Sequence, residues 1–451
     1  MLNLPIGIFK ILWILLFVLS TITFGNLAFY SLLSIYGLKK PKRDYELKED
    51  SRTFLFIIPA HNEEAVIENC LQSIEQLDYD SKKYASVVLS DNCEDRTAEL
   101  SSNYRNTTVF YNTYKEAEPK GKPHVIGKYL NENTNYWQEF DYIVLIDADN
   151  LVSSNFLKEI NSQFISAPES MVIQGYLDTK NISDSIISRG YAAAYFITNR
   201  AIQYSKHRLS WNTAIGGTGF AMATKYIKEK GWQPKSYTED FEIQVALSIE
   251  GKKSSWNHFA RVYDEKPNSI NVSHVQRTRW SQGHWYIAFS KTYQLIKSFF
   301  KSENLVQLFN KVETLIYSYS MLRAIWLLLI VILIGVDARF IEKLPSLFSL
   351  FYFWIPFELL NYVILPLVYI FQEGEEYFLK LSYYGKIKEL FLLWISFFFT
   401  TFIYNFAQIQ GFFTWFFPQN NWKKTDHTRN INYDDLSEKV KKRGVPINKK
   451  D

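Results

Sequence analysis

The feature that most constrains this chain is that its long apolar stretches lie near its two ends. Segment 6–38 is apolar but for a lysine, an asparagine and scattered hydroxyls, and it is longer than the core of a signal peptide. Segments 317–336, 346–371 and 390–417 are each long enough to span a bilayer. We therefore predict a membrane protein with a soluble middle part, although a buried core helix is the alternative for the first segment.

Charge indicates on which side of the membrane the middle part lies. A basic run from Lys39 to Arg43 directly follows the first apolar segment, and basic residues recur after Lys439. Because Lys and Arg favour the cytosolic flanks of membrane helices, we predict a multi-pass protein of the cell membrane with a cytosolic middle part. The net charge of +4 does not suggest a nucleic-acid partner. Two cysteines, Cys70 and Cys93, do not suggest a disulfide framework and are predicted to be thiols.

From residue 53 onward, short β-branched runs alternate with helical stretches. The predicted strands are 53–58 (ended by Pro59), 86–90, 107–111 and 142–146, and the predicted helices are 63–77, 95–104 and 124–130. This alternation predicts an α/β fold with a mostly parallel sheet and helices on both faces. Ligands of such sheets bind beyond the carboxyl ends of the strands, where the polar side chains of this region lie.

Asp147 and Asp149 follow the fourth predicted strand. At the end of an extended strand, the side chains of residues i and i+2 point the same way, so both carboxylates are expected to face one site. Two carboxylates suit Mg²⁺ or Mn²⁺ that bridges to a diphosphate. The alternative is a solvated turn.

Two more polar residues are predicted at the same edge of the sheet. Asp91 ends the second strand and can accept hydrogen bonds from a nucleobase or ribose. Its alternative role is helix capping, for which Asp95 is well placed. Lys122 can neutralise phosphate charge, although a loop lysine is often only solvated.

Two segments further along combine residue types that suit sugar chemistry. Thr238 and Glu239 precede Asp240 at the start of a predicted helix. Asp240 is interpreted as a base that deprotonates a hydroxyl attacking a sugar carbon, whereas the structural alternative is a helix start. Segment 276–280 combines an amide, two arginines and a tryptophan, which suits sugar and phosphate binding. An interfacial helix with snorkelling arginines is the alternative.

Taken in order, these segments resemble the inverting family 2 glycosyltransferases, specifically the membrane-integrated cellulose, hyaluronan and chitin synthases. The segments that carry the resemblance are 59–64, 90–93, 147–149, 216–220, 238–240, 276–280 and 422–427, within a match of about residues 55–430. His61 departs from the family pattern, in which an aromatic tyrosine precedes Asn-Glu.

The resemblance implies a GT-A domain, a UDP-sugar donor, and Mg²⁺ or Mn²⁺ as cofactor. It implies Asp240 as the catalytic base and Asp149, with Asp147, as metal ligands. The implied nucleotide-sugar-binding residues are Glu63, Asp91, Lys122, Asp147, Arg279, Trp422, Thr425 and His427. The implied acceptor-binding residues are Gly217, Thr218, Gly219, Glu239, Gln276 and Trp280.

The resulting prediction is an inverting enzyme that extends a β-linked polysaccharide, such as a capsule, exopolysaccharide or cell-wall polymer. Single-sugar transfer to a lipid-linked acceptor, a non-catalytic scaffold and a transporter are the alternatives. The predicted partners are the UDP-sugar donor, a carbohydrate or lipid-linked acceptor and the bilayer, with a second copy or an export partner left open.

The predicted domains are an N-terminal anchor with a basic linker at 1–45, a cytosolic GT-A domain at 46–275, interfacial amphipathic helices at 276–312, C-terminal membrane helices at 313–417 and a cytosolic tail at 418–451. Segment 390–417 contains Asn405, Gln408 and Gln410. We predict that it lies partly in the interface or re-enters, which leaves the tail in the cytosol.

Overall fold

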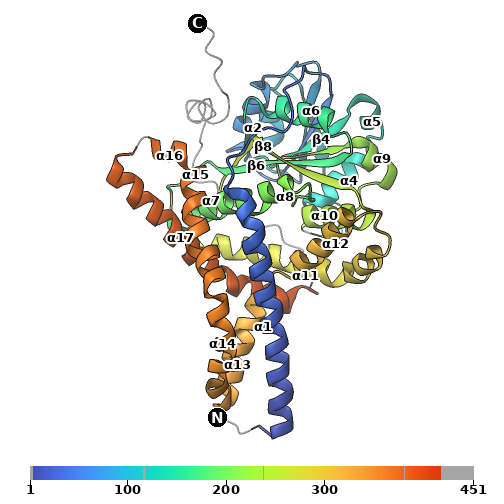
Figure 1. Ribbon diagram of the computed structural model, residues 1–451. Coiled ribbons are helices and arrows are strands. Elements are labelled where there is room, and N and C mark those ends of the chain that lie inside the picture. Colours follow the sequence, from blue (N-terminus) through green and yellow to red (C-terminus); the bar gives the residue numbers. More distant parts are fainter. Residues whose placement is uncertain (1–3, 115–117, 237, 380, 418–451) are drawn as a thin grey trace.

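An eight-stranded sheet organises the middle of the chain, in the strand order β3-β2-β1-β4-β7-β6-β8-β5 (Figure 1). The computed structural model describes residues 4–114, 118–236, 238–379 and 381–417. The strands are β1 (Phe54–Ala60), β2 (Tyr84–Asp91), β3 (Thr107–Asn112), β4 (Tyr142–Leu145), β5 (Leu151–Val152), β6 (Ser170–Thr179), β7 (Phe220–Ala223) and β8 (Lys253–Asp264).

Strand direction confirms the prediction of a mostly parallel sheet. Strand β1 is parallel to β2 and β4, β2 is parallel to β3, and β6 is parallel to β8. Among the described strands, only β7, between β4 and β6, and β5, beside β8, run against their neighbours. The carboxyl ends of β1, β2, β4, β6 and β8 therefore meet at one edge.

The prediction that Pro59 ends the first strand is wrong, because β1 continues through Ala60. The carbonyl of Ile57 accepts a hydrogen bond from the backbone N–H of Ile146, so residues 57 and 59 both direct their backbone groups toward β4. Strand β4 has already ended at Leu145. A proline at position 59 therefore removes no hydrogen bond from the sheet.

Helices cover both faces of the sheet, as predicted. Phe54, Phe56 and Ile58 point to the face covered by α2 and α6, whereas Leu55 and Ile57 point to the face covered by α4, α9 and α10. This alternation follows from the two-residue period of a strand. The helical elements of this part are α2 (Ile67–Glu75), α3 (Thr97–Ser101), α4 (Lys122–Glu132), α5 (Tyr136–Glu139), α6 (Phe156–Ser166), α7 (Ile186–Thr198), η2 (Asn199–Tyr204), α8 (Ser205–Arg208), α9 (Thr224–Lys230) and α10 (Glu239–Glu250).

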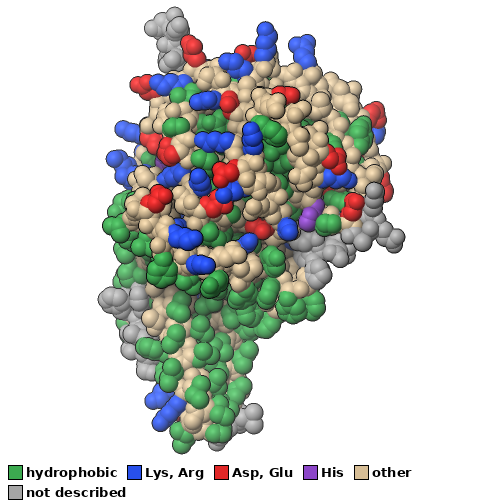
Figure 2. Space-filling view, turned by 90° about the vertical axis from the view of Figure 1, so that its right-hand side faces the viewer, with side chains coloured by type: hydrophobic (Ala, Val, Ile, Leu, Met, Phe, Trp, Pro, Cys, Tyr) green, Lys and Arg blue, Asp and Glu red, His purple; other side chains and the backbone are tan. Residues whose placement is uncertain are grey.

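Three of the remaining helices, α1, α13 and α14, extend from the sheet as a stalk with an apolar surface. Figure 1 shows α1, α13 and α14 running together away from the sheet, and Figure 2 shows hydrophobic side chains over the stalk and charged ones over the sheet region. The helical elements outside the sheet region are α1 (Ile6–Ile35), η1 (Tyr36–Leu38), α11 (Ile270–Phe299), α12 (Leu305–Ser318), α13 (Leu322–Val336), α14 (Arg339–Leu359), η3 (Leu360–Ile364), α15 (Leu365–Glu373), α16 (Glu375–Leu379) and α17 (Tyr383–Thr414).

Among the described residues, three helical segments are long and apolar enough to cross a membrane: Ile6–Leu38, Ile355–Glu373 and Tyr383–Thr414. The first agrees with the predicted anchor. The predicted span 317–336 is instead divided between α12 and α13, which bend by 40° at their junction and together form a fourth candidate. The predicted domain limits stay predictions.

Helix α17 includes most of segment 390–417 as one continuous helix of 32 residues. It runs obliquely beneath the sheet, beside α7 and α11, rather than along α1 (Figure 1). Glycines allow this close packing: a Cβ at Gly190 of α7 would lie 2.6 Å from the carbonyl oxygen of Ser396, and one at Gly411 would lie 3.0 Å from the backbone nitrogen of Gln282. Helix α17 is therefore packed directly onto the helices that bear site residues.

Candidate active site

A cavity of about 460 Å³ opens at the edge where the carboxyl ends of the strands meet. It is lined by most of the residues singled out in the sequence: Glu63, Asp91, Lys122, Asp147, Asp149, Gly217, Thr218, Glu239, Asp240, Gln276, Arg279 and Trp280. Gly219 adjoins Thr218 but does not line this cavity. Trp422, Thr425 and His427 lie outside the described residues.

The Asp-x-Asp segment lies in a turn and not at the end of an extended strand. Strand β4 ends at Leu145, and the backbone N–H of Asn150 donates to the carbonyl of Asp147 at 3.0 Å. The prediction that both carboxylates point the same way because they extend a strand is therefore wrong. Both Asp147 and Asp149 nevertheless line the cavity, because the turn brings them to the same side. The hydroxyl of Thr218 accepts a 3.0 Å hydrogen bond from the backbone N–H of Asp147 and fixes the turn.

Lys122 joins the acidic groups of the site. It opens helix α4, and its Nζ lies 2.7 Å from Oδ1 of Asp147, 3.1 Å from Oε1 of Glu239 and 2.6 Å from the carbonyl oxygen of Gly217. Burial alone would lower the pKa of Lys122, but the two carboxylates outweigh burial and raise the pKa above its ordinary value. Lys122 is thus a largely covered cation, with 11% of its side chain exposed, held against the Asp-x-Asp turn, and is not a solvated loop lysine.

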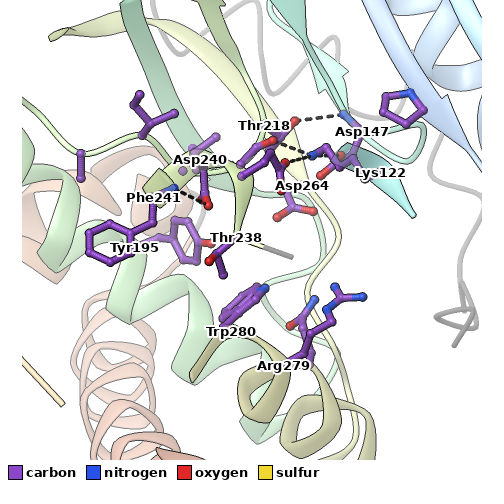
Figure 3. Close-up of a pocket in the computed structure, with 18 of the residues that line it drawn as sticks. Lys122, Asp147, Tyr195, Thr218, Thr238, Asp240, Phe241, Asp264, Arg279 and Trp280 are labelled. Atoms are coloured by element: carbon purple, nitrogen blue, oxygen red, sulfur yellow. Dashed lines mark hydrogen bonds and ion pairs between the residues drawn. The ribbon is translucent and has the colours of Figure 1, made fainter. Parts of the chain in front are cut away.

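Asp240 lies one residue inside the start of α10, as predicted. Its Oδ1 accepts a 2.7 Å hydrogen bond from the backbone N–H of Phe241. Gly217 has a φ of +76°, and a Cβ there would be 3.3 Å from Oδ2 of Asp240. Burial, followed by the charge of Glu239, raises the pKa of Asp240 to about 7. Figure 3 shows Asp240 and Thr238 across the cavity from Lys122 and Asp147.

The end of the cavity near β1 and β2 is built around Asp91. Its two carboxylate oxygens accept hydrogen bonds from Nδ2 of Asn112 at 2.8 Å and from the hydroxyl of Tyr114 at 3.0 Å. Burial raises the pKa of Asp91, and these two hydrogen bonds partly offset the increase. His61 contacts the same segment, with Nδ1 2.6 Å from the carbonyl oxygen of Asp91.

The opposite end of the cavity is formed by α11 with α7 and α17. The hydroxyl of Tyr191 donates to Oε1 of Gln276 at 3.1 Å, and its ring meets that of Trp280 edge-on at 6.4 Å. Arg277 lies between the rings of Tyr191 and Tyr404, at 4.1 and 4.4 Å, whereas Arg279 lines the cavity. Tyr404 belongs to α17 and also lines the cavity, so a candidate membrane helix contributes to the site.

Three residues that sequence reasoning missed hold these groups in place: Asn150, Gln174 and Asp264. The amide of Gln174 donates to the carbonyl of Thr218 at 2.9 Å and accepts from the backbone N–H of Gly216 at 2.8 Å. Asp264 ends β8 and lines the cavity, where Asn150 and Lys266 contact it. Only Asn150 had a sequence signal, since it directly follows Asp149.

The donor set of the site fits a divalent metal. Asp147 and Asp149 present carboxylate oxygens, the ligands preferred by Mg²⁺ and Mn²⁺. In the described part of the chain, no group of three or more His, Cys, Asp or Glu side chains is placed to hold an ion. A metal here would therefore need ligands from phosphate or water, as is usual for Mg²⁺.

Fold and site together define a glycosyltransferase with a mixed α/β, GT-A-like domain. The chain belongs to the family described as "Glycosyltransferase like family 2", whose family model matches residues 51–283. This membership makes the chain an enzyme, so the scaffold and transporter alternatives are not supported.

Relatives agree with this assignment. The chain is 24% identical over 261 residues to "Probable glycosyltransferase YdaM" of Bacillus subtilis and to a poly-beta-1,6-N-acetyl-D-glucosamine synthase of Staphylococcus aureus. Each match covers 57% of this chain and 61% of the relative, so it spans about three fifths of their length. The fold is similar to that of the mannosyltransferase PcManGT from Pyrobaculum calidifontis, solved with GDP-Man and Mn²⁺, with a TM-score of 0.51, 16% identity and coverage of 80% of this chain and 96% of that one.

Proposed function

We propose that this enzyme transfers a sugar from a UDP-sugar to the end of a β-linked polysaccharide at the membrane, with inversion at the anomeric carbon. One observation carries the proposal. Lys122 donates hydrogen bonds to Asp147 and to the carbonyl of Gly217, and Gly217 packs beside the carboxylate of Asp240. The charges suited to a diphosphate thus adjoin a carboxylate suited to act as a base.

The donor is held by residues from the sheet edge. Asp91 and Glu63 bind the nucleoside, while Lys122 and Arg279 contact the diphosphate. Asp149 and Asp147 hold Mg²⁺ or Mn²⁺, which when bound stabilises negative charge on the diphosphate. Lys122 supplies a second positive charge at the same turn, and its raised pKa keeps it protonated at neutral pH.

Asp240 is the base. It takes the proton of the acceptor hydroxyl as that oxygen forms a bond to the anomeric carbon. The bond from this carbon to the diphosphate breaks on the opposite side, and its electron pair leaves with UDP. A base with a pKa of about 7 is well matched to this task, since proton transfer is most effective when the pKa lies near the working pH.

The acceptor lies on the side of the cavity formed by Trp280, Gln276, Glu239 and the loop that contains Gly217, Thr218 and Gly219. A second cavity of about 300 Å³ lies mainly among α1, α7, α13 and η3. It shares Thr198 with the first cavity and includes Arg323, Glu358 and Asn361. Its position supports an acceptor that extends into the membrane part.

Two acceptor classes fit this arrangement. The similarity to a poly-β-1,6-N-acetylglucosamine synthase supports a growing polysaccharide, such as a capsule, exopolysaccharide or wall polymer. The second cavity also suits transfer of one sugar to a lipid-linked acceptor, which is the alternative. The proposed location is the cell membrane, with the GT-A domain at 46–275 and the tail at 418–451 in the cytosol.

Product length separates the two acceptor classes. The full chain, purified in lipid nanodiscs, is incubated with labelled UDP-sugars, and the products are sized on a gel. A ladder of long products supports polymer synthesis, whereas products longer by one sugar support the lipid-linked alternative. Asp240→Asn is the matched control, because it removes the base and keeps the side-chain shape.

A further inference from the structure

Asn150, directly after the Asp-x-Asp turn, is fully buried and uses both ends of its amide. Its Nδ2 donates to Oδ1 of Asp149 at 2.9 Å and to Oδ1 of Asp264 at 3.3 Å. Its Oδ1 accepts a 2.6 Å hydrogen bond from the hydroxyl of Thr218. An amide is needed here, since a carboxylate of the same shape has no hydrogen to donate to Asp149.

The hydroxyl of Thr218 extends this network to the backbone of Asp147, the other acidic residue of the turn. It donates to Asn150 and accepts from the backbone N–H of Asp147. A path of hydrogen bonds therefore runs from the side chain of Asp149 through Asn150 and Thr218 to Asp147. The same loop contains Gly217, which lies against Asp240.

The far side of Asn150 is fixed to the sheet. Asp264 ends β8 and forms an ion pair with Lys266, which is almost fully buried. Asp149 is also held by its backbone, because Nζ of Lys180 donates to its carbonyl oxygen at 2.8 Å. The main chain of Asp149 is thus fastened independently, and Asn150 acts on the direction of its carboxylate.

We propose that Asn150 is a positioning residue that aims the Asp149 carboxylate at the divalent metal and couples it to the loop beside Asp240. This inference rests on the proposed function for the presence of the metal. Hydrogen-bond partners of metal-binding carboxylates fix their orientation, and their loss typically costs about 10–100-fold in metal affinity. Asn150 touches the metal ligand and not the reacting atoms.

The test measures Mn²⁺ binding without turnover. Full-length protein in nanodiscs is titrated with Mn²⁺ in the presence of UDP and without acceptor, and free Mn²⁺ is read by electron paramagnetic resonance. Asn150→Ala and Thr218→Val are each expected to weaken Mn²⁺ binding by about 10–100-fold. The double variant is expected to be no weaker than the worse single variant, because both break one path. Thr218→Ser, which keeps the hydroxyl, is expected to bind more tightly than Thr218→Val.

Asn161 supplies the matched control. It is also fully buried, in α6, and its amide accepts from the backbone N–H of Arg52 and donates to the carbonyl of Glu49, away from the cavity. Asn161→Ala is expected to lower the melting temperature without changing Mn²⁺ affinity.

The outcomes separate this inference from the proposed function. Mn²⁺ affinity within about twofold of wild type in Asn150→Ala, or additive effects in the double variant, overturns the inference and leaves the proposed function intact. A wild-type protein that binds no Mn²⁺ in the presence of UDP overturns both.

Discussion

Gly283 of α11 is expected to control the position of the catalytic base. A Cβ added there would lie 2.7 Å from Cγ2 and 3.1 Å from Cβ of Thr238, and closer still to its hydroxyl oxygen. Non-bonded carbon atoms prefer separations of about 3.5–4.0 Å. Gly283→Ala must therefore move Thr238, and with it the neighbouring Glu239 and Asp240, by about 1 Å.

The size of the effect follows from this displacement. A misplacement of about 1 Å at a reacting group costs about 100-fold in rate. We expect kcat to fall by about that factor, while the affinity for UDP stays close to wild type because Asp91 and the Asp-x-Asp turn lie on other elements. The assay measures UDP release at saturating donor and UDP affinity by calorimetry, with the full chain in nanodiscs.

A second substitution tests the cause. The hydroxyl of Thr238 makes no hydrogen bond within the described residues, so Thr238→Ala removes the two nearest clashing atoms, Oγ1 and Cγ2, without breaking a hydrogen bond. The Gly283→Ala, Thr238→Ala double variant is expected to recover at least about tenfold of the lost rate. Gly335→Ala in α13 is the matched control, since a Cβ there meets no atom of the described residues within 4 Å. Wild-type kcat in Gly283→Ala, or a double variant that is no faster, would refute the reasoning.

Further predictions concern the base, the metal and the tail. Asp240→Asn is expected to lower the transfer rate by about 10²–10⁴-fold while calorimetry shows nearly unchanged UDP affinity; transfer at the wild-type rate would place the base elsewhere. Because only deprotonated Asp240 can accept a proton, kcat is expected to fall as the pH drops below about 7, and Glu239→Gln is expected to move this acid limb to lower pH by removing a charge that raises the pKa. If Glu239→Gln left the acid side of the pH–rate profile unchanged, the charge of Glu239 would not be a cause of the raised pKa of Asp240. Asp149→Ala is expected to lose UDP binding and turnover together, and activity that survives EDTA would contradict the metal role. A cysteine at Asn448, which lies outside the described residues, is expected to escape an impermeant thiol reagent in intact cells; labelling would place the tail outside.

The sequence predicted the first half of the sheet because its strands are buried on both faces. Strands β1 and β4 read as nearly continuous apolar runs and β2 has an apolar centre at residues 87–89, which is typical of parallel strands covered by helices. The prediction that the first strand ends at Pro59 is wrong. A proline is tolerated there because β4 ends before it could pair with residue 59, and β4 is a neighbour in space and not in sequence.

The residues proposed to carry the chemistry were predictable where they form motifs. The residues that hold them in place by hydrogen bonds were not. Asp147, Asp149 and Asp240 belong to short patterns that can be read along the chain. Gln174 and Asp264 act through contacts with residues distant in sequence, and a single buried amide or carboxylate has no periodic signature. The packing of α17 against α7 and α11 depends on isolated glycines, whose role appears only when the helices are placed together.

One measurement tests the central claim most directly: release of UDP by the full chain in nanodiscs, across a panel of UDP-sugars, with and without Mn²⁺, for the wild type and Asp240→Asn. The account predicts that at least one UDP-sugar supports release, that release requires the metal, and that the substitution lowers it by about 10²–10⁴-fold. Absence of release with every UDP-sugar, or release that is indifferent to both EDTA and Asp240→Asn, would contradict it.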